Sequence, residues 1–243
     1  MRTIPIIKNV ESLWMNLGCV FIPTKNLVAC MLSSWMLCAV VSSQGITTAS
    51  DFFKSVSERY TQIKDYEADI QIRIGKSSMA GKVSFKRPEM LRIDFTDPAE
   101  QVIVFNGDSL VIYLPGSSAI LEQSVSGGEG NFATAEGLSL LRRYYTVAYE
   151  VGQSPVPLED GSEEMVVKLS LSRKSAGEAF RTIKLSVDPE TRLIRRVDAT
   201  SSQDVRYVFD FANYNINTGI SDQRFLYDPP SSANNYNNFL LSE

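Results

Sequence analysis

The sequence predicts a mainly β protein in which an antiparallel meander carries two amphipathic helices. Polar and apolar residues alternate through 67–74, the period-two pattern of a strand with one solvated face. Similar segments follow after short turns, too short for the crossovers that parallel pairing requires. The composition, with 44% hydrophobic and 21% charged residues among 243, is that of a globular protein with a packed core. The acidic balance, a net charge of −4, disfavours nucleic acid as a partner.

The first predicted element is a helix that begins after Thr48. Thr48 followed three residues later by Asp51 matches a capping pattern, which satisfies amide groups left free at a helix start. Phe53, Val56 and Tyr60 then recur at helical spacing. This helix therefore has one apolar face that must be buried.

The meander follows the helix. Asn106-Gly107 predicts a two-residue hairpin, because both residues tolerate positive φ. Residues 155–162 are predicted to form a loop, and the Ser- and Asn-rich segment from Ser231 is predicted to be mobile. We expect about eleven strands, near residues 68–74, 82–86, 91–95, 101–105, 110–114, 119–123, 147–151, 165–171, 180–187, 193–198 and 205–211.

A second helix is predicted at residues 135–145, where Leu138, Leu141 and Tyr145 share a face that must lie on the sheet. The Gly- and Ser-rich residues 124–131 precede it. They lack the Gly-Lys-Ser/Thr ending of a phosphate-binding loop, which favours a flexible hinge.

The first forty-odd residues have the pattern of a leader. Residues 27–41 form an uncharged apolar run after Lys25, shorter than the roughly 20 residues of a bilayer span and typical of a secretory signal. We expect residues 1–43 to be removed, with a true start at Met15, and residues 44–243 to form the mature domain. An alternative stays open: residues 27–30 are similar to a lipobox, which would place a lipid on Cys30.

The residue types exclude most catalytic chemistry. The chain has no histidine, and its three cysteines, Cys19, Cys30 and Cys38, all lie in the leader. Nucleophile–histidine pairs and zinc sites are therefore excluded from the mature domain. Asp94 and Asp97 are assigned to a solvated face and a turn. We therefore expect that the protein is not an enzyme and that it binds no metal and no cofactor. The enzymatic alternative is an Asp- or Lys-based activity on lipid.

Four motifs in order resemble the LolA family of periplasmic carriers of outer-membrane lipoproteins. They are the Lys86-Arg87-Pro88 corner, the hairpin at 105–115 with its Tyr-x-Pro ending, the strand series at 182–211 and the closing Phe-Leu-Tyr-Asp-Pro-Pro at 225–230. The likeness covers about residues 48–235. It implies an unclosed antiparallel β-barrel with an α-helical lid on the concave face.

The resemblance also implies a site. Arg87 corresponds to the arginine that hydrogen-bonds the lid helices and keeps the empty carrier closed; the alternative is a surface arginine at a strand corner. The acyl-chain site would be lined by residues that are alternatively closed core: Ile70, Ile72, Val83, Phe85, Leu91, Ile93, Phe95, Tyr113, Leu138 and Leu141.

The function implied by the resemblance is transport of lipoproteins through the periplasm towards the outer membrane. The partners would be lipidated proteins, an inner-membrane lipoprotein-releasing transporter and an outer-membrane acceptor, with the carrier acting as a monomer. The alternative for the same fold is a membrane-anchored acceptor or a lipid-responsive sensor.

Overall fold

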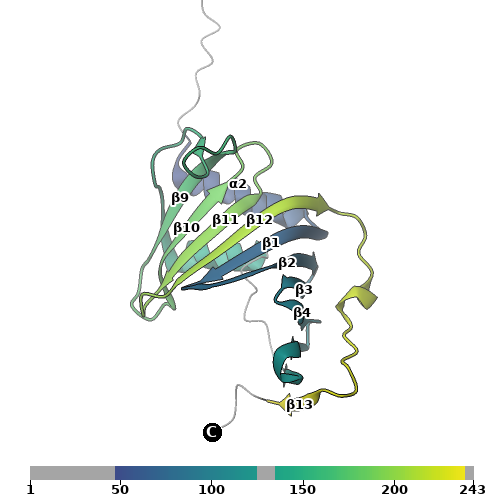
Figure 1. Cartoon of the computed structure of the whole chain (residues 1–243). Helices are drawn as coiled ribbons and strands as arrows, with labels where there is room; N and C mark the ends of the chain where they lie inside the picture. The colour runs from purple at the N-terminus through teal and green to yellow at the C-terminus, as the bar shows by residue number, and fades with distance from the viewer. Residues whose placement is uncertain (1–46, 125–134, 239–243) are drawn as a thin grey trace, which may run out of the picture. The chain divides into compact units, whose positions relative to one another are not determined.

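An unclosed sheet of thirteen strands dominates the computed structural model, which describes residues 47–124 and 135–238 (Figure 1). The predicted leader and the predicted hinge lie outside these residues, except for Ser124 at the end of the sixth strand. The strands are β1 (Asp65–Ile74), β2 (Ser77–Lys86), β3 (Met90–Asp97), β4 (Ala99–Phe105), β5 (Ser109–Leu114), β6 (Ala119–Ser124), β7 (Tyr145–Tyr149), β8 (Val156–Pro157), β9 (Met165–Arg173), β10 (Phe180–Val187), β11 (Ile194–Ser201), β12 (Arg206–Ile216) and β13 (Asn234–Asn237).

Two α-helices accompany the sheet, α2 (Ala49–Gln62) and α3 (Ala135–Tyr144), with short 3₁₀ turns η1 (Pro115–Ser117) and η2 (Asp222–Phe225). Both predicted helices and all eleven predicted strands are present. The two further strands, β8 and β13, are short and lie where the sequence predicted loop and mobile tail.

The sheet is a meander in two halves joined by the pairing of β1 with β12. Its order is β13-β6-β5-β4-β3-β2-β1-β12-β11-β10-β9-β7, and β8 pairs with β9 off this path. Every pairing is antiparallel except that of β13 with β6. The predicted fold class, mainly β with an unclosed antiparallel sheet, is confirmed.

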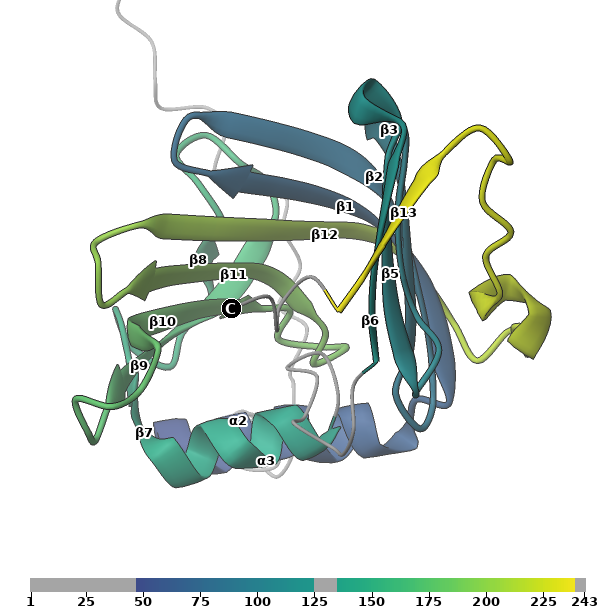
Figure 2. The same ribbon diagram turned by 90° about the horizontal axis from the view of Figure 1, so that it is seen from below.

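Helix α2 begins as the sequence predicts. The Thr48 side chain accepts a hydrogen bond from the backbone N–H of Asp51 at 3.1 Å and donates one to its carboxylate at 2.7 Å. Phe53 and Val56 are fully buried. Figure 2 shows α2 and α3 side by side beneath the sheet, where both helices cover its concave face.

The concave face carries the main core. In β1 the buried residues Ala68, Ile70 and Ile72 alternate with more exposed polar neighbours, as their spacing predicts. They pack with the apolar faces of α2 and α3 and with β9, β10 and β11. One continuous cluster thus joins the helices to the sheet.

The sheet turns a corner between β2 and β3. The register shifts between Ala80 and Gly81, which opposes Phe95, and such irregularities bend a strand. A Cβ at Gly81 would lie 2.3 Å from the carbonyl oxygen of Asp94, so only glycine fits this close approach. Figure 2 shows the result: β3, β5 and β6 rise at a steep angle to β11 and β12. We call β3–β6 the second wall of the sheet, and β1, β2 and β7–β12 the first wall.

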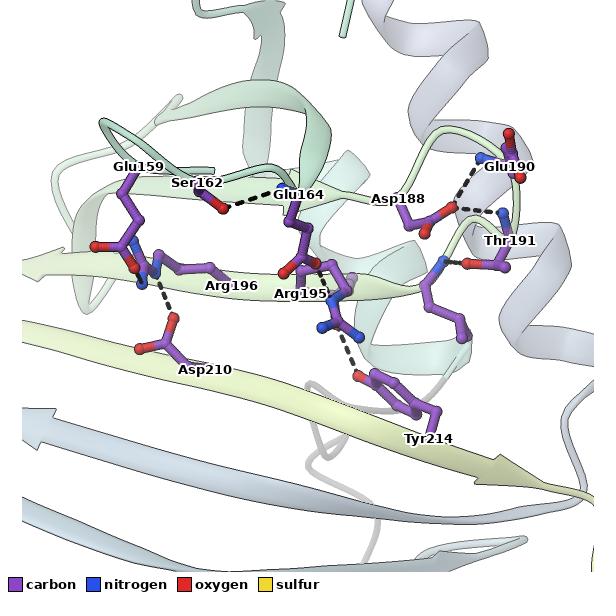
Figure 3. A network of polar contacts seen from close by, with 12 residues as sticks. Glu159, Ser162, Glu164, Asp188, Glu190, Thr191, Arg195, Arg196, Asp210 and Tyr214 are labelled. Carbon is purple, nitrogen blue, oxygen red and sulfur yellow. Dashed lines mark hydrogen bonds and ion pairs between the residues drawn. The ribbon is translucent and has the colours of Figure 1, made fainter. Parts of the chain in front are cut away.

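Ion pairs gather on the convex face of the first wall (Figure 3). A register shift between Ser186 and Val187 makes Arg195 an extra residue in β11. Arg195 pairs with Glu164, while Arg196 pairs with Asp210 on β12 and, at 2.8 Å, with Glu159. These arginines therefore fasten the loop between β8 and β9 to the outside of the sheet.

The segment after β12 covers the convex face of the second wall. Buried Asp65 accepts hydrogen bonds from the backbone N–H groups of Thr218 and Gly219, which fixes where the segment starts. Phe225 of η2 is fully buried against Val102 and Val104. The segment ends in β13, so the prediction of a mobile tail from Ser231 was wrong at residues 234–237.

The β4–β5 hairpin also differs from the prediction. Its loop has three residues, 106–108, because the Asn106 side chain accepts hydrogen bonds from the backbone N–H groups of both Asp108 and Ser109, each at 2.9 Å. Only Gly107 adopts positive φ, at 104°.

Candidate functional site

A cavity of about 310 Å³ lies between the concave face of the sheet and the two helices. Apart from three tyrosine hydroxyls, its side chains are hydrocarbon. The lining residues are Tyr60, Tyr66, Ile70, Val83, Leu91, Ile93, Leu138, Leu141, Phe180, Ile183, Leu185, Ile194, Val197, Ala199, Phe209, Phe211 and Tyr214. An apolar cavity of this kind suits an apolar ligand.

Helix α2 supplies Tyr60 and is fastened at its C-terminal end by Arg87. The Nη2 atom of Arg87 donates to the backbone carbonyl of Tyr60 at 2.9 Å, and Nε donates to that of Ile63 at 2.8 Å. The last carbonyls of a helix have no partner inside it, and a guanidinium offers several donors to them. The β2–β3 corner is thereby tied to the end of α2.

Helix α3 supplies Leu138 and Leu141, both buried. Its C-terminal end is held by Lys174, which follows β9. The Nζ atom of Lys174 donates to the backbone carbonyls of Arg142 at 3.3 Å and Arg143 at 3.1 Å. A cation at this end also complements the helix dipole. Each helix that covers the cavity therefore has one basic side chain, from a turn that follows a strand, at its C-terminus.

The polar end of the cavity is formed by Tyr60, Tyr66 and Tyr214. The backbone N–H of Ile194 donates to the Tyr60 hydroxyl at 3.2 Å, and the Tyr214 hydroxyl donates to the Ile194 carbonyl at 2.7 Å. Burial raises the pKa of all three tyrosines, so their hydroxyls stay protonated at neutral pH.

Six of the ten residues predicted for the acyl-chain site line this cavity: Ile70, Val83, Leu91, Ile93, Leu138 and Leu141. Ile72, Phe85 and Phe95 are buried in the adjoining core. Tyr113 lies on the other side of the sheet, because its partners across the ladders are Val102 and Ile120. There its ring contacts Tyr227 of the C-terminal segment, with centroids 6.0 Å apart.

The second half of the meander supplies lining residues that the sequence analysis did not select. Ile183 and Leu185 of β10, and Phe209 and Phe211 of β12, are each separated by one polar residue. This alternation marks one face of each strand and was available in the sequence. Lys174 was also missed, because an isolated lysine in a turn carries no signal of its own.

The described residues carry no arrangement suited to metal chemistry. In 47–124 and 135–238, no three histidine, cysteine, aspartate or glutamate side chains are placed to hold a metal ion. Within the same ranges, neither α-helix has the length and apolar character needed to cross a bilayer.

A protein-family model, "Outer membrane lipoprotein carrier protein LolA", matches residues 52–228, which is most of the chain. The chain belongs to the LolA family. This membership confirms the resemblance seen in the motifs, and it relates the chain to lipoprotein-binding and lipoprotein-sorting proteins. No curated protein matches the chain significantly in sequence.

Solved structures similar to this LolA-family chain are distant in sequence. A conserved protein from Thermus thermophilus superposes with a TM-score of 0.51 at 14% identity, over 76% of this chain and 98% of that one. A LolA superfamily protein from Nitrosomonas europaea superposes with a TM-score of 0.35 at 13% identity, over 74% of this chain and 98% of that one. MucB in the Pseudomonas aeruginosa MucA/MucB complex superposes with a TM-score of 0.48 at 14% identity, over 74% of this chain and 61% of that one. The first of these likenesses shows a shared fold.

Proposed function

We propose that this protein carries the acyl chains of lipoproteins in its cavity through the periplasm towards the outer membrane. The observation that carries the proposal is the hydrocarbon-lined cavity between the concave face and helices α2 and α3. Membership of the LolA family supports the same ligand class. The protein would act as a binding protein and not as an enzyme.

The energetics suit a reversible carrier. Each CH₂ group moved from water into an apolar site gains about 0.8 kcal/mol, so such a cavity can replace the bilayer for part of an acyl chain. The cavity volume of about 310 Å³ is at the low end of ligand pockets. Binding of several chains would therefore require α3 or α2 to move, which breaks the hydrogen bonds of Lys174 or Arg87. Those bonds would favour release.

The proposed route gives the carrier two partners. Cargo would come from an inner-membrane lipoprotein-releasing transporter and pass to an outer-membrane acceptor. Export would depend on the leader in residues 1–43, with cleavage after Ser43.

The test is binding of a fluorescent triacylated lipopeptide to protein purified as its host processes it. We expect saturable binding that a non-fluorescent lipopeptide displaces, and acyl-bearing material in the natively purified protein by mass spectrometry. A matched control is Leu138→Asp, which places a carboxylate in the cavity lining and should abolish binding. If the unaltered protein neither binds the lipopeptide nor contains acylated material, the carrier function is wrong.

Mass spectrometry of the same sample also separates the carrier from an anchored acceptor. A free carrier should begin at Gln44 and partition into the aqueous phase of a detergent extraction. A chain that begins at a lipidated Cys30 and enters the detergent phase would contradict the carrier role and favour the acceptor.

A further inference from the structure

The three tyrosines at the polar end of the cavity are not equivalent. Tyr60 comes from α2, Tyr66 from β1 and Tyr214 from β12, and the rings of Tyr66 and Tyr214 lie with centroids 5.5 Å apart. Tyr66 also packs against Phe85, with centroids 5.3 Å apart. The ring of Tyr66 is thus wedged between two aromatic neighbours, which fixes the direction of its hydroxyl.

Two of the hydroxyls are used within the protein. Tyr60 accepts a hydrogen bond from the backbone N–H of Ile194, and Tyr214 donates one to the carbonyl of the same residue. This small network holds the start of β11 to α2 and β12. Its hydroxyls therefore have structural partners before any ligand arrives.

The hydroxyl of Tyr66 has no such partner. Its residue is only 2% exposed, and none of the residues in 47–124 and 135–238 hydrogen-bonds its hydroxyl. Across these ranges no side-chain oxygen or nitrogen is both fully enclosed and without a partner, so this hydroxyl must meet open space. Because Tyr66 lines the cavity, that space is the cavity. A nearly buried donor without a partner points to a ligand acceptor.

The chemistry of the acceptor follows from the surroundings. Burial raises the pKa of the Tyr66 hydroxyl, and the nearby Tyr60 adds a smaller effect in the same direction. The hydroxyl therefore keeps its proton and remains a donor at neutral pH. An anion would be costly in a hydrocarbon cavity, whereas a neutral carbonyl oxygen accepts a hydrogen bond and brings no charge. Acyl chains bear such a carbonyl where they join glycerol or an amine.

We propose that the Tyr66 hydroxyl donates a hydrogen bond to the carbonyl oxygen of an ester- or amide-linked acyl chain. The cavity then recognises the head of the chain as well as its hydrocarbon, and favours acylated cargo over free hydrocarbon or fatty-acid anions. This inference rests on the proposed carrier function, because it names the group that the same cavity would select.

The experiment compares two lipopeptides that differ only in the linkage of their chains. One carries two palmitoyl ester chains on a glyceryl cysteine, and the other carries the same chains through ether bonds, without carbonyls. The protein is expressed from its full gene and purified as its host processes it. We expect it to bind the ester form about three- to tenfold more tightly than the ether form, the usual effect of one hydrogen bond. A third peptide with a single N-palmitoyl amide tells the amide source of the carbonyl from the ester source.

Tyr66→Phe removes one oxygen and should abolish this preference while it leaves binding of the ether form unchanged. The matched control is Tyr145→Phe, whose buried hydroxyl donates to the carbonyl of Phe180 and does not line the cavity. The control should retain the preference. A preference that persists in Tyr66→Phe, or equal affinity of the unaltered protein for ester and ether, overturns the inference but leaves the carrier function intact. Failure to bind either lipopeptide overturns the carrier function itself.

Infrared spectroscopy of a ¹³C-carbonyl ester bound to the unaltered protein gives an answer even if the variant does not fold. A carbonyl that accepts the Tyr66 hydrogen bond absorbs at lower frequency than the same ester in hydrocarbon solvent. An unshifted band in the complex would contradict the proposal directly.

Discussion

The guanidinium Nη2 of Arg87 lies 2.9 Å from the backbone carbonyl oxygen of Tyr60, so the β2–β3 corner holds the helix end that also lines the cavity. This contact gives Arg87 a position from which it would resist opening at α2. The hydrogen bond from Arg87 Nε to the backbone carbonyl of Ile63 further stabilises this attachment.

Replacement of Arg87 by Met removes the donors and keeps an apolar stem. We expect a loss of about 1–3 kcal/mol in the free energy of unfolding, because carbonyls at the end of α2 lose charged partners. We also expect slower release of bound lipopeptide and faster hydrogen exchange in the last turn of α2. Lys54→Met on the exposed side of the same helix is the control. Unchanged release by Arg87→Met would contradict the lid-locking role.

Lys174→Met tests the second helix in the same way. Lys174 is exposed and its hydrogen bonds to Arg142 and Arg143 are long, so we expect a smaller loss of about 0.3–1 kcal/mol. Hydrogen exchange measured by mass spectrometry should quicken in α3 and stay unchanged in α2. Lys76→Met, exposed in the β1–β2 turn, serves as the control. Equal quickening in both helices would show that they move as one lid.

The segment after β12 should loosen in acid because it is held to β3 through Asp94. Burial by itself would raise the pKa of Asp94, but hydrogen bonds and charge from Arg92, joined by Arg224, outweigh it and hold the pKa below its usual range. A carboxyl whose pKa is lowered by folding stabilises the fold above its unfolded pKa of about 3.9, and this stability is lost as pH falls through the folded pKa.

Asp94→Asn should therefore cost about 1–2 kcal/mol at pH 7, and the difference from the unaltered protein should shrink below about pH 4. Urea unfolding at a series of pH values measures it, with Asp108→Asn in the exposed β4–β5 loop as control. A difference that is constant down to pH 3 would show that the arginine pairs of Asp94 do not stabilise the segment.

Gly81→Ala tests the corner of the sheet. The new Cβ would lie 2.3 Å from the carbonyl oxygen of Asp94 and 2.8 Å from the Cα of Phe95, both backbone atoms that cannot move alone. We expect a loss of about 3 kcal/mol, measured by thermal or urea unfolding. Gly116→Ala meets nothing within 4 Å and should change stability by less than about 1 kcal/mol. Equal stability of the two variants would mean that the sheet relaxes freely at the corner.

Local pattern was sufficient for much of the fold. Residues two to four positions apart determine the cap at Thr48, the apolar face of α2 and the alternation in β1. The structure contains all three as predicted. The tail was misjudged because Asn is poor in strands by propensity. In β13 its side chains are exposed, and the strand is formed mainly by backbone pairing with β6, beside one hydrogen bond from Asn235 to the Glu122 carboxylate at 3.5 Å.

The candidate site was less accessible to sequence reasoning. Residues 110–114 are apolar on both faces of β5, so their periodicity could not show that Tyr113 lies on the convex side. Phe85 and Phe95 lie in the core next to the cavity, and only packing in three dimensions separates core from cavity. The lack of a hydrogen-bond partner for the Tyr66 hydroxyl could not be foreseen either, because its surroundings include residues as distant in sequence as Tyr214.

The parallel pairing of β13 with β6 has a consequence for solubility. An unclosed sheet presents outer strands whose unpaired N–H and C=O groups can template growth by another chain. β13 occupies the free side of β6 with an Asn-rich strand whose residues are all exposed. The outermost strand on this side of the sheet is thus only four residues long and polar, which limits its use as a template by another chain.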